Sequence, residues 1–236
     1  MTSGTGDYFS EGQILAFDKP LHWTSFDLVN KIRIMIRSAM GIRKIKVGHA
    51  GTLDPLAEGL MIICTGSATK KIDEFFNLEK EYVATIQLGK TTPSFDLETE
   101  VDSYFETAHI TKEMVEETLM KFKGETFQLP PLYSAKFIEG KRAYEYARKG
   151  VEKKLDPVKI VISEMELIEF NLPVVKVRLV CSKGTYIRSF ARDLGQALGS
   201  GAHLTALKRT AIGKYRVEDA LNLEKFALLL EQLKQV

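Results

Sequence analysis

The chain contains 236 residues, 44% of them hydrophobic, with a formal net charge of +2, so it can bury the core of one large lobe or two smaller lobes of a soluble globular protein. Its longest apolar run, Leu60 to Cys64, is too short to span a bilayer, and Met1 to Ser10 lacks the regions of a signal peptide, so we expect a cytoplasmic protein without membrane contact. Cys64 and Cys181 lack CxxC spacing and indicate neither a disulfide framework nor a zinc site.

The basic residues are segregated along the chain. No acidic residue occurs from Leu28 to Leu53 or from Leu194 to Val217, whereas the segment from Asp96 to Glu125 is rich in acids. One charged run is usually only a solvated face. Two acid-free blocks far apart in the sequence predict a basic surface that faces a polyanion, and nucleic acid is the leading class of partner.

The first elements have clear local signals. The apolar run 13–18 predicts a strand that leaves Lys19 at its end. Thr24 or Ser25 can cap a helix with apolar residues at helical spacing, and Gly41 ends it.

The irregular stretch 46–70 contains the turn Thr-Leu-Asp-Pro and reads as an active-site loop. Pro55 holds Asp54 on an extended or turn-like backbone. Gly48, Gly51 and Gly59 permit a close approach of the backbone to a bulky substrate. An isolated Asp-Pro pair is most often a surface turn, but here an apolar run follows at once and takes the loop into the core.

The next segments predict a buried strand at 61–65, a short helix at 68–76 and a strand at 81–88 in which Tyr82 shares a face with alternate residues. Thr111 caps a helix that ends at Gly124. From 127 to 150 a Pro-Pro segment and a short basic helix with two tyrosines suggest a projecting nucleic-acid clamp, although ordinary packing of these tyrosines is an equal alternative.

The pattern of the last third of the chain predicts two long antiparallel strands at 158–170 and 174–181. A turn at 183–188 then leads into a helix that ends at Leu198. An apolar and basic segment at 203–212 and a closing helix at 221–233 follow. Helices mixed with long antiparallel strands, without regular alternation of strand and helix, favour an α+β fold over a doubly wound α/β fold.

Three separated segments are similar to the signature of the TruB family of tRNA pseudouridine synthases: GHAGTLDPLAEGL at 48–60, EYVATIQLG at 81–89 and CSKGTYIRSFARDLG at 181–195. The combination is specific, whereas each piece alone is weak. The resemblance implies an α+β fold with a mixed, mainly antiparallel central sheet flanked by helices. It also implies a single catalytic domain over 1–236 with an RNA-clamping insertion at about 128–154, and the chain ends without the PUA domain of many relatives.

The resemblance further implies that Asp54 is catalytic in isomerising uridine to pseudouridine at position 55 of the tRNA T-loop, without a cofactor or metal. Breaking a nucleosidic bond builds positive charge on the sugar, which a carboxylate can stabilise or trap. Arg188 would pair with Asp54, and Tyr82 would lie against the base and help to remove the C5 proton. His49, Tyr186 and Leu207 would hold the flipped nucleoside.

Each role has a plainer alternative. Arg188 could be a surface charge at a helix start, Tyr82 an ordinary core tyrosine and His49 a structural histidine. Asp54 could attack C1' or C6 or act by elimination.

Ala50 stands where the family usually has threonine, which removes a hydroxyl and leaves the catalytic register unchanged.

The predicted partner is the T-arm of tRNA, bound by a monomer. Loop shape, phosphates and splayed bases are the features through which such RNA is recognised. Candidate RNA contacts are Lys19, Lys136, Arg142, Lys183, Lys208 and Arg209. Two alternatives stay open: a non-catalytic module that binds or folds tRNA, and a glycosylase that would release free uracil.

Overall fold

The computed structural model describes residues 5–134, 136–151 and 153–235. The chain divides into two compact units: unit 1 comprises Met1–Tyr82 and Lys208–Val236, and unit 2 comprises Val83–Leu207. The strands β4 (Lys80–Leu88) and β12 (Ala202–Ile212) contribute residues to both units. The single catalytic domain expected over the whole chain stays a prediction.

In unit 1, strands lie in the order β1-β3-β12, with β2 beside β3 and β13 beside β12. The strands β1 and β3 are antiparallel, from Ile14 opposite Cys64 to Lys19 opposite Gly59. The strand bounds are β1 (Ile14–Lys19), β2 (Val47–His49), β3 (Ala57–Thr65) and β13 (Tyr215–Arg216). The helices of the unit are α1 (Thr5–Glu11), α2 (Ser25–Met40), the 3-10 helix η1 (Gly66–Lys71), α3 (Ile72–Phe76) and α7 (Leu223–Lys234).

The sequence of α2 determines both of its ends. The Thr24 hydroxyl accepts a bond from the Asp27 N–H at 3.0 Å, and the Asp27 carboxylate accepts one from the Thr24 N–H at 2.9 Å. These two bonds form a capping box. Gly41 ends the helix with a φ of 65°, in the left-handed region that glycine adopts without strain. The predicted cap and stop of this helix are therefore confirmed.

The core of unit 1 forms around β3, whose central residues are all buried. Their apolar side chains pack with residues of η1, α3, β12 and the C-terminal segment, including Phe75, Ile212 and Val217. Cys64 belongs to this core, and its burial raises the thiol pKa to about 11. The thiol is therefore neutral and unreactive near pH 7.

In unit 2, the strand order is β12-β4-β11-β10-β7. The strand β10 pairs antiparallel with β11 on one side and with β7 on the other. Burial alternates along β4, with Tyr82 and every second residue buried as predicted. The main elements are β7 (Gly124–Gln128), β10 (Val158–Asn171), β11 (Val174–Cys181), α4 (Lys112–Phe122) and α6 (Ile187–Ala197). Helices that flank a mainly antiparallel sheet confirm the predicted α+β fold.

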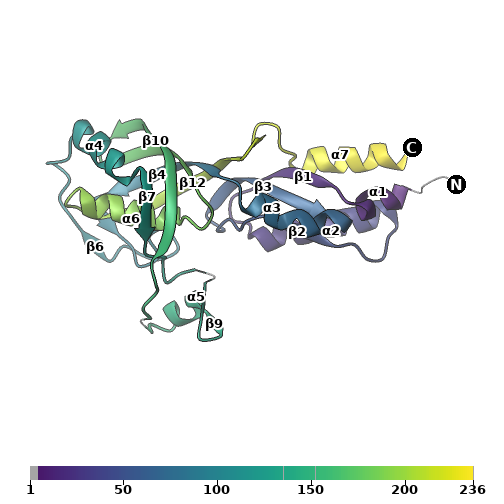
Figure 1. The fold of residues 1–236 in the computed structure, drawn as a ribbon, viewed down its shortest axis with the longest axis horizontal. Coiled ribbons are helices and arrows are strands. Elements are labelled where there is room, and N and C mark those ends of the chain that lie inside the picture. The colour runs from purple at the N-terminus through teal and green to yellow at the C-terminus, as the bar shows by residue number, and fades with distance from the viewer. Residues whose placement is uncertain (1–4, 135, 152, 236) are drawn as a thin grey trace. The chain divides into compact units, whose positions relative to one another are not determined.

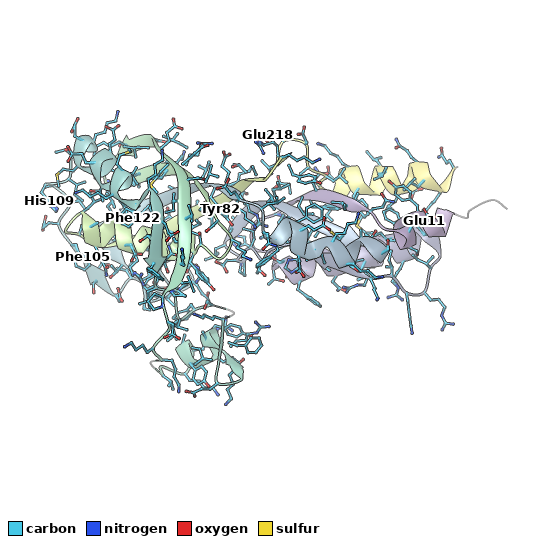
Figure 2. The ribbon with its side chains drawn as sticks, viewed as in Figure 1. Glu11, Tyr82, Phe105, His109, Phe122 and Glu218 are labelled. Atoms are coloured by element: carbon cyan, nitrogen blue, oxygen red, sulfur yellow. The ribbon has the colours of Figure 1, made fainter. Side chains whose placement is uncertain are left out.

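Aromatic packing joins the helices α4 and α6 of unit 2. Phe122 lies at the end of α4 (Figure 2). Its ring packs edge to face against that of Phe190 of α6, with 5.6 Å between the ring centroids. Nearby, His109 Nε2 lies 2.9 Å from the carbonyl oxygen of Leu198, the residue after α6. These contacts fix α6 in unit 2.

Two small hairpins complete unit 2: β5 (Lys90–Thr91) pairs with β6 (Ser103–Tyr104), and β8 (Phe137–Ile138) pairs with β9 (Lys141–Arg142). The short helix α5 (Ala143–Ala147) follows β9. Figure 1 shows β9 and α5 standing away from the sheet of this unit. The segment predicted as a clamp, about 128–154, thus has a projecting form, and positions 135 and 152 within it lie outside the described residues. Among the described residues, no helix combines the length and the apolar character that crossing a membrane requires.

Candidate active site

The Asp54 turn connects β2 to β3, and hydrogen bonds to Ser25, the first residue of α2, hold its backbone in place. The buried Ser25 hydroxyl accepts a hydrogen bond from the Leu53 N–H at 2.9 Å and donates one to the Leu53 carbonyl at 3.0 Å. The Asp54 carbonyl accepts a bond from the Ala57 N–H at 3.0 Å. The backbone on both sides of Asp54 is therefore held in place, while its side chain is only half-buried.

Arg209 links the two flanks of this loop inside unit 1. Its side chain is almost fully buried, and its guanidinium donates to the carbonyls of Leu60 at 2.7 Å and Gly51 at 3.2 Å. Gly59 has a φ of 108°, and a Cβ at this position would lie 2.3 Å from the Arg209 carbonyl oxygen. Only glycine allows β3 to approach β12 so closely. The predicted RNA contact of Arg209 is not tested by this geometry.

Lys19, at the end of β1 as predicted, is fully buried. Its ammonium donates to the carbonyls of Pro20 at 2.9 Å and Trp23 at 2.6 Å. Burial lowers the pKa of Lys19 to about 8, and the negative charges of Asp54 and Glu58 oppose this fall. Lys19 therefore lies within the electrostatic reach of Asp54.

The lowered pKa of Lys19 predicts a pH-dependent stability. Between pH 8 and 10.5 the unfolded chain binds more protons at Lys19 than the folded chain, so the free energy of unfolding should rise with pH across this window. The rise should total about 3 kcal/mol and should be absent in Lys19→Met. Urea unfolding of both proteins at several pH values measures it, with Lys70→Met as an exposed control. Parallel pH curves for the wild type and Lys19→Met would contradict the prediction.

His49 ends β2 and is half-buried. Its Nδ1 atom is buried and has no hydrogen-bond partner among the residues that the structure describes. Burial lowers the pKa of His49, and the Gly51 backbone partly opposes the effect, so the ring is neutral near pH 7. An unpartnered buried ring nitrogen is unusual in a folded core and fits a site that receives a polar ligand.

Arg188, the second residue of α6, is buried in unit 2 together with a carboxylate. Its Nε lies 3.5 Å from Asp96 Oδ2, and the two side chains are only 6% and 7% exposed. Its Nη1 also donates to the Ser94 carbonyl at 3.4 Å. The guanidinium is therefore no surface charge. The predicted pairing of Arg188 with Asp54 joins residues of different units and stays a prediction.

Asp96 and Gln128 were not identified from the sequence. Asp96 lies in a segment that reads as an acid-rich loop, and nothing local marks it as the partner of Arg188. Gln128 is buried at the end of β7, where it accepts from the Tyr186 N–H at 2.8 Å and donates to the Tyr186 carbonyl at 3.1 Å. These two bonds hold Tyr186, the half-buried N-cap residue of α6.

The other two candidates for base contact are buried on strands. Tyr82 lies on β4 (Figure 2), belongs to unit 1 and is 9% exposed. Leu207 lies on β12, belongs to unit 2 and is 8% exposed. Both positions are compatible with ordinary packing as well as with a ligand. Their predicted contacts with the flipped base stay predictions.

The projecting segment combines cations with aromatic rings. The Arg142 guanidinium lies 3.8 Å from the ring centroid of Phe137, which is 61% exposed. Lys136 donates to the Asp156 carbonyl at 3.1 Å. Elsewhere Lys183 is exposed, and the partly exposed Lys208 lies 3.8 Å from the Glu58 carboxylate. Exposed rings beside guanidinium groups can stack on unpaired bases. Among the described residues, no cluster of three His, Cys, Asp or Glu side chains could hold a metal ion.

Two family models match consecutive parts of the chain. Residues 37–187 match the model of the TruB family pseudouridylate synthase N-terminal domain, and residues 188–235 match the tRNA pseudouridylate synthase B C-terminal domain. The two matches define the class of protein as the pseudouridylate synthases. The chain belongs to the TruB family, as the sequence motifs predicted.

Curated relatives named tRNA pseudouridine synthase B cover nearly the whole chain. The protein of Phocaeicola vulgatus is 60% identical over 95% of this chain and 95% of its own length. That of Parabacteroides distasonis is 59% identical with the same coverage. The protein of Flavobacterium johnsoniae is 49% identical over 94% of this chain and 97% of its own length.

Solved structures show the same fold. A chain of the Cbf5-Nop10-Gar1 complex is 25% identical, with a TM-score of 0.69 over 94% of this chain. A chain of an H/ACA RNP bound to a substrate RNA containing 2'-deoxyuridine is 23% identical, with a TM-score of 0.68 over 96% of this chain. The present chain spans 55% and 56% of the length of these two chains.

Proposed function

We propose that this chain isomerises uridine to pseudouridine at position 55 in the T-loop of tRNA, as a cytoplasmic monomer, with Asp54 as the catalytic residue. The observation that carries the proposal is the Asp54 turn. Its neighbour Leu53 is fixed by two hydrogen bonds to Ser25, and the surrounding sequence belongs to the TruB family. Support for tRNA as the substrate comes from the relatives named tRNA pseudouridine synthase B.

The reaction rearranges one nucleotide without net oxidation. The bond from C1' to N1 of uracil breaks, the base rotates, and C5 forms a bond with C1'. C5 loses a proton and N1 gains one. The Asp54 carboxylate stabilises or traps the positive charge that develops on the ribose. A guanidinium beside Asp54, which we assign to Arg188, would keep that carboxylate ionised next to an extruded base.

The base must leave its stack to reach Asp54, which costs a few kcal/mol. We assign Tyr82 to the face of the flipped uracil and to the removal of the C5 proton. We assign His49, Tyr186 and Leu207 to contacts with the flipped nucleoside, and His49 Nδ1, which has no partner among the described residues, would supply a polar contact. Gln128 supports this role because it fixes the backbone of Tyr186.

The assignment to position 55 can be tested with tRNA transcripts. The wild-type protein should place pseudouridine at position 55, detected by carbodiimide labelling and primer extension. A transcript with cytidine at position 55 should gain no modification. Pseudouridine at another position of either transcript would contradict the assignment to the T-loop.

A second region of unit 1 suits the phosphate backbone of the same RNA. Its exposed cations form no ion pair with any acid in the described part of the chain. Two contacts connect the segments that carry these cations: Arg33 of α2 donates to the Val47 carbonyl at 3.3 Å, and the Lys46 carbonyl accepts from the Gly66 N–H at 2.9 Å, where η1 begins. We call this region the basic face of unit 1, and it consists of Arg37, Arg43, Lys44, Lys46, Lys70 and Lys71.

The basic face predicts a salt-dependent contribution to tRNA affinity. The triple variant Arg43→Gln, Lys44→Gln, Lys46→Gln should bind tRNA more weakly than the wild type. Because each lost phosphate contact lowers the slope of log affinity against log salt by about 0.9, this slope should fall by about 2 to 3. Filter binding at several salt concentrations measures it.

A matched control removes three cations that already have acidic partners. Lys112, Lys159 and Lys176 lie in unit 2 and pair with Glu116, Glu125 and Glu169. Their replacement by glutamine should leave the salt slope nearly unchanged. Equal losses of affinity in both triple variants would show that only net charge matters and would contradict a role for the basic face.

A further inference from the structure

Arg192 lies one helical turn after Arg188 on α6, so both side chains leave the same face of the helix. The guanidinium carbon of Arg192 lies 4.8 Å from the ring centroid of Phe95. Arg188 contacts the residues on either side of Phe95, namely the Ser94 carbonyl at 3.4 Å and the Asp96 carboxylate at 3.5 Å. Two arginines of one helix therefore hold three consecutive residues of one turn.

The turn at 94–96 needs such support because Phe95 has a φ of 63°, a left-handed conformation that is strained for a bulky residue. Its backbone is tied by the Leu204 N–H, which donates to the Phe95 carbonyl at 2.9 Å. The Thr92 hydroxyl donates to the Asp96 carbonyl at 2.7 Å. These bonds hold the backbone of the turn, whereas the contact with Arg192 holds the Phe95 ring.

The Arg192 side chain is itself held in place. Its Nη2 lies 2.6 Å from Asp193 Oδ1, and its Nε donates to the same oxygen at 2.7 Å. Nη2 also lies 3.4 Å from the Leu129 carbonyl, at the base of the projecting segment. The side chain is only 14% exposed. A flat guanidinium can stack on a ring and donate in its own plane at once, which the ammonium of lysine cannot do.

We propose that Arg192 is a positioning residue for the isomerisation: through its cation–π contact with Phe95 it fixes the 94–96 turn, and through that turn it orients Arg188. The proposal rests on the proposed function, because Arg188 matters for the rate only if the chain catalyses the reaction. Arg192 does not touch the substrate in this account. Its loss should slow the chemical step and leave tRNA affinity unchanged.

The test measures tritium release from tRNA labelled at uridine C5, with enzyme in excess, together with the dissociation constant of the complex. Arg192→Ala and Phe95→Leu should each slow the single-turnover rate by roughly 10- to 100-fold, as expected when a catalytic group is slightly misplaced. The dissociation constant should stay within about twofold of the wild type. Arg178→Ala, which removes an arginine from a surface pair with Glu164 in the same unit, is the matched control and should keep the full rate.

Two further variants separate positioning from general loss of structure. Phe95→Tyr keeps the ring and should restore the rate, whereas Arg192→Lys keeps the charge without the flat guanidinium and should stay slow. The double variant Arg192→Ala, Phe95→Leu should be no slower than the slower single variant, because both act through one contact.

Several results would overturn the inference while leaving the proposed function intact. One is a wild-type rate in both Arg192→Ala and Phe95→Leu. Another is a double variant whose rate loss equals the product of the two single losses. A third is weaker tRNA binding by Arg192→Ala at an unchanged rate, which would make Arg192 an RNA contact. If the wild-type protein itself released no tritium, the proposed function would fail and the inference with it.

Discussion

Asp54→Asn should lose pseudouridine formation almost completely while keeping its affinity for tRNA. The substitution preserves the shape of the side chain and removes the charge that stabilises the developing cation. We expect the single-turnover rate to fall by roughly a thousandfold or more, which corresponds to about 4 kcal/mol of transition-state stabilisation. Single-turnover kinetics and filter binding with the same tRNA transcript measure both quantities.

The Asp54 turn should survive this change, because the bonds between Ser25 and Leu53 and the bond from the Ala57 N–H to the Asp54 carbonyl do not involve the carboxylate. The thermal midpoint of Asp54→Asn should therefore stay close to that of the wild type. Asp73→Asn, an isosteric change at an exposed position of α3 in the same unit, is the matched control and should keep full activity. A rate for Asp54→Asn within about tenfold of the wild type would show that the carboxylate is not catalytic.

Arg188→Gln should reduce both stability and activity. The Arg188 and Asp96 side chains are 6% and 7% exposed, so removal of the guanidinium leaves a buried carboxylate without its cation. Breaking such a buried pair from one side costs about 3 to 5 kcal/mol in the free energy of unfolding. The catalytic rate should fall as well, because we assign this guanidinium to Asp54. Urea unfolding and single-turnover kinetics measure the two effects.

Arg178 provides the comparison for Arg188. It pairs with Glu164 at 3.0 Å, but its side chain is 30% exposed and that of its partner 59%. Arg178→Gln should therefore cost less than about 1 kcal/mol and leave the rate unchanged. Equal losses of stability in the two variants would mean that the Arg188–Asp96 pair is no stronger than a surface pair.

The parts of the fold that local sequence determines were predictable. The cap and stop of α2 depend on Thr24, Asp27 and Gly41, which are neighbours of the helix ends they fix. The alternation of β4 and the long hairpin of β10 and β11 likewise follow from the period of their apolar residues. In each case the residues that set the structure lie within the element or beside it.

The long-range contacts of the site were not predictable in the same way. Arg188 meets Ser94 across 94 positions, and Gln128 meets Tyr186 across 58. Periodicity and turn signals give no information about such pairs. The motif at 181–195 therefore pointed to Arg188 and Tyr186 as candidates, but not to Asp96 and Gln128, which bind them. A single sequence offers no local signal for Asp96 beyond an acid in a loop.

The buried cations show a second limit of sequence reasoning. Lys19 and Arg209 are candidates for contact with RNA, which stays a prediction, but no local signal in the sequence indicated that both side chains are excluded from solvent. Their donors are used by main-chain carbonyls, among them those of Leu60 and Gly51 beside the Asp54 turn. Charge alone could not separate these two residues from the exposed cations, because burial depends on the packing of distant segments.

The most direct test of the central claim uses a T-arm transcript that carries tritium at uridine C5. The wild-type protein should release tritium to water without releasing free uracil, and Asp54→Asn should release neither. Release of free uracil would identify a glycosylase. Tight binding without tritium release, from this transcript and from full-length tRNA, would contradict the enzymatic function and leave a module that binds or folds tRNA.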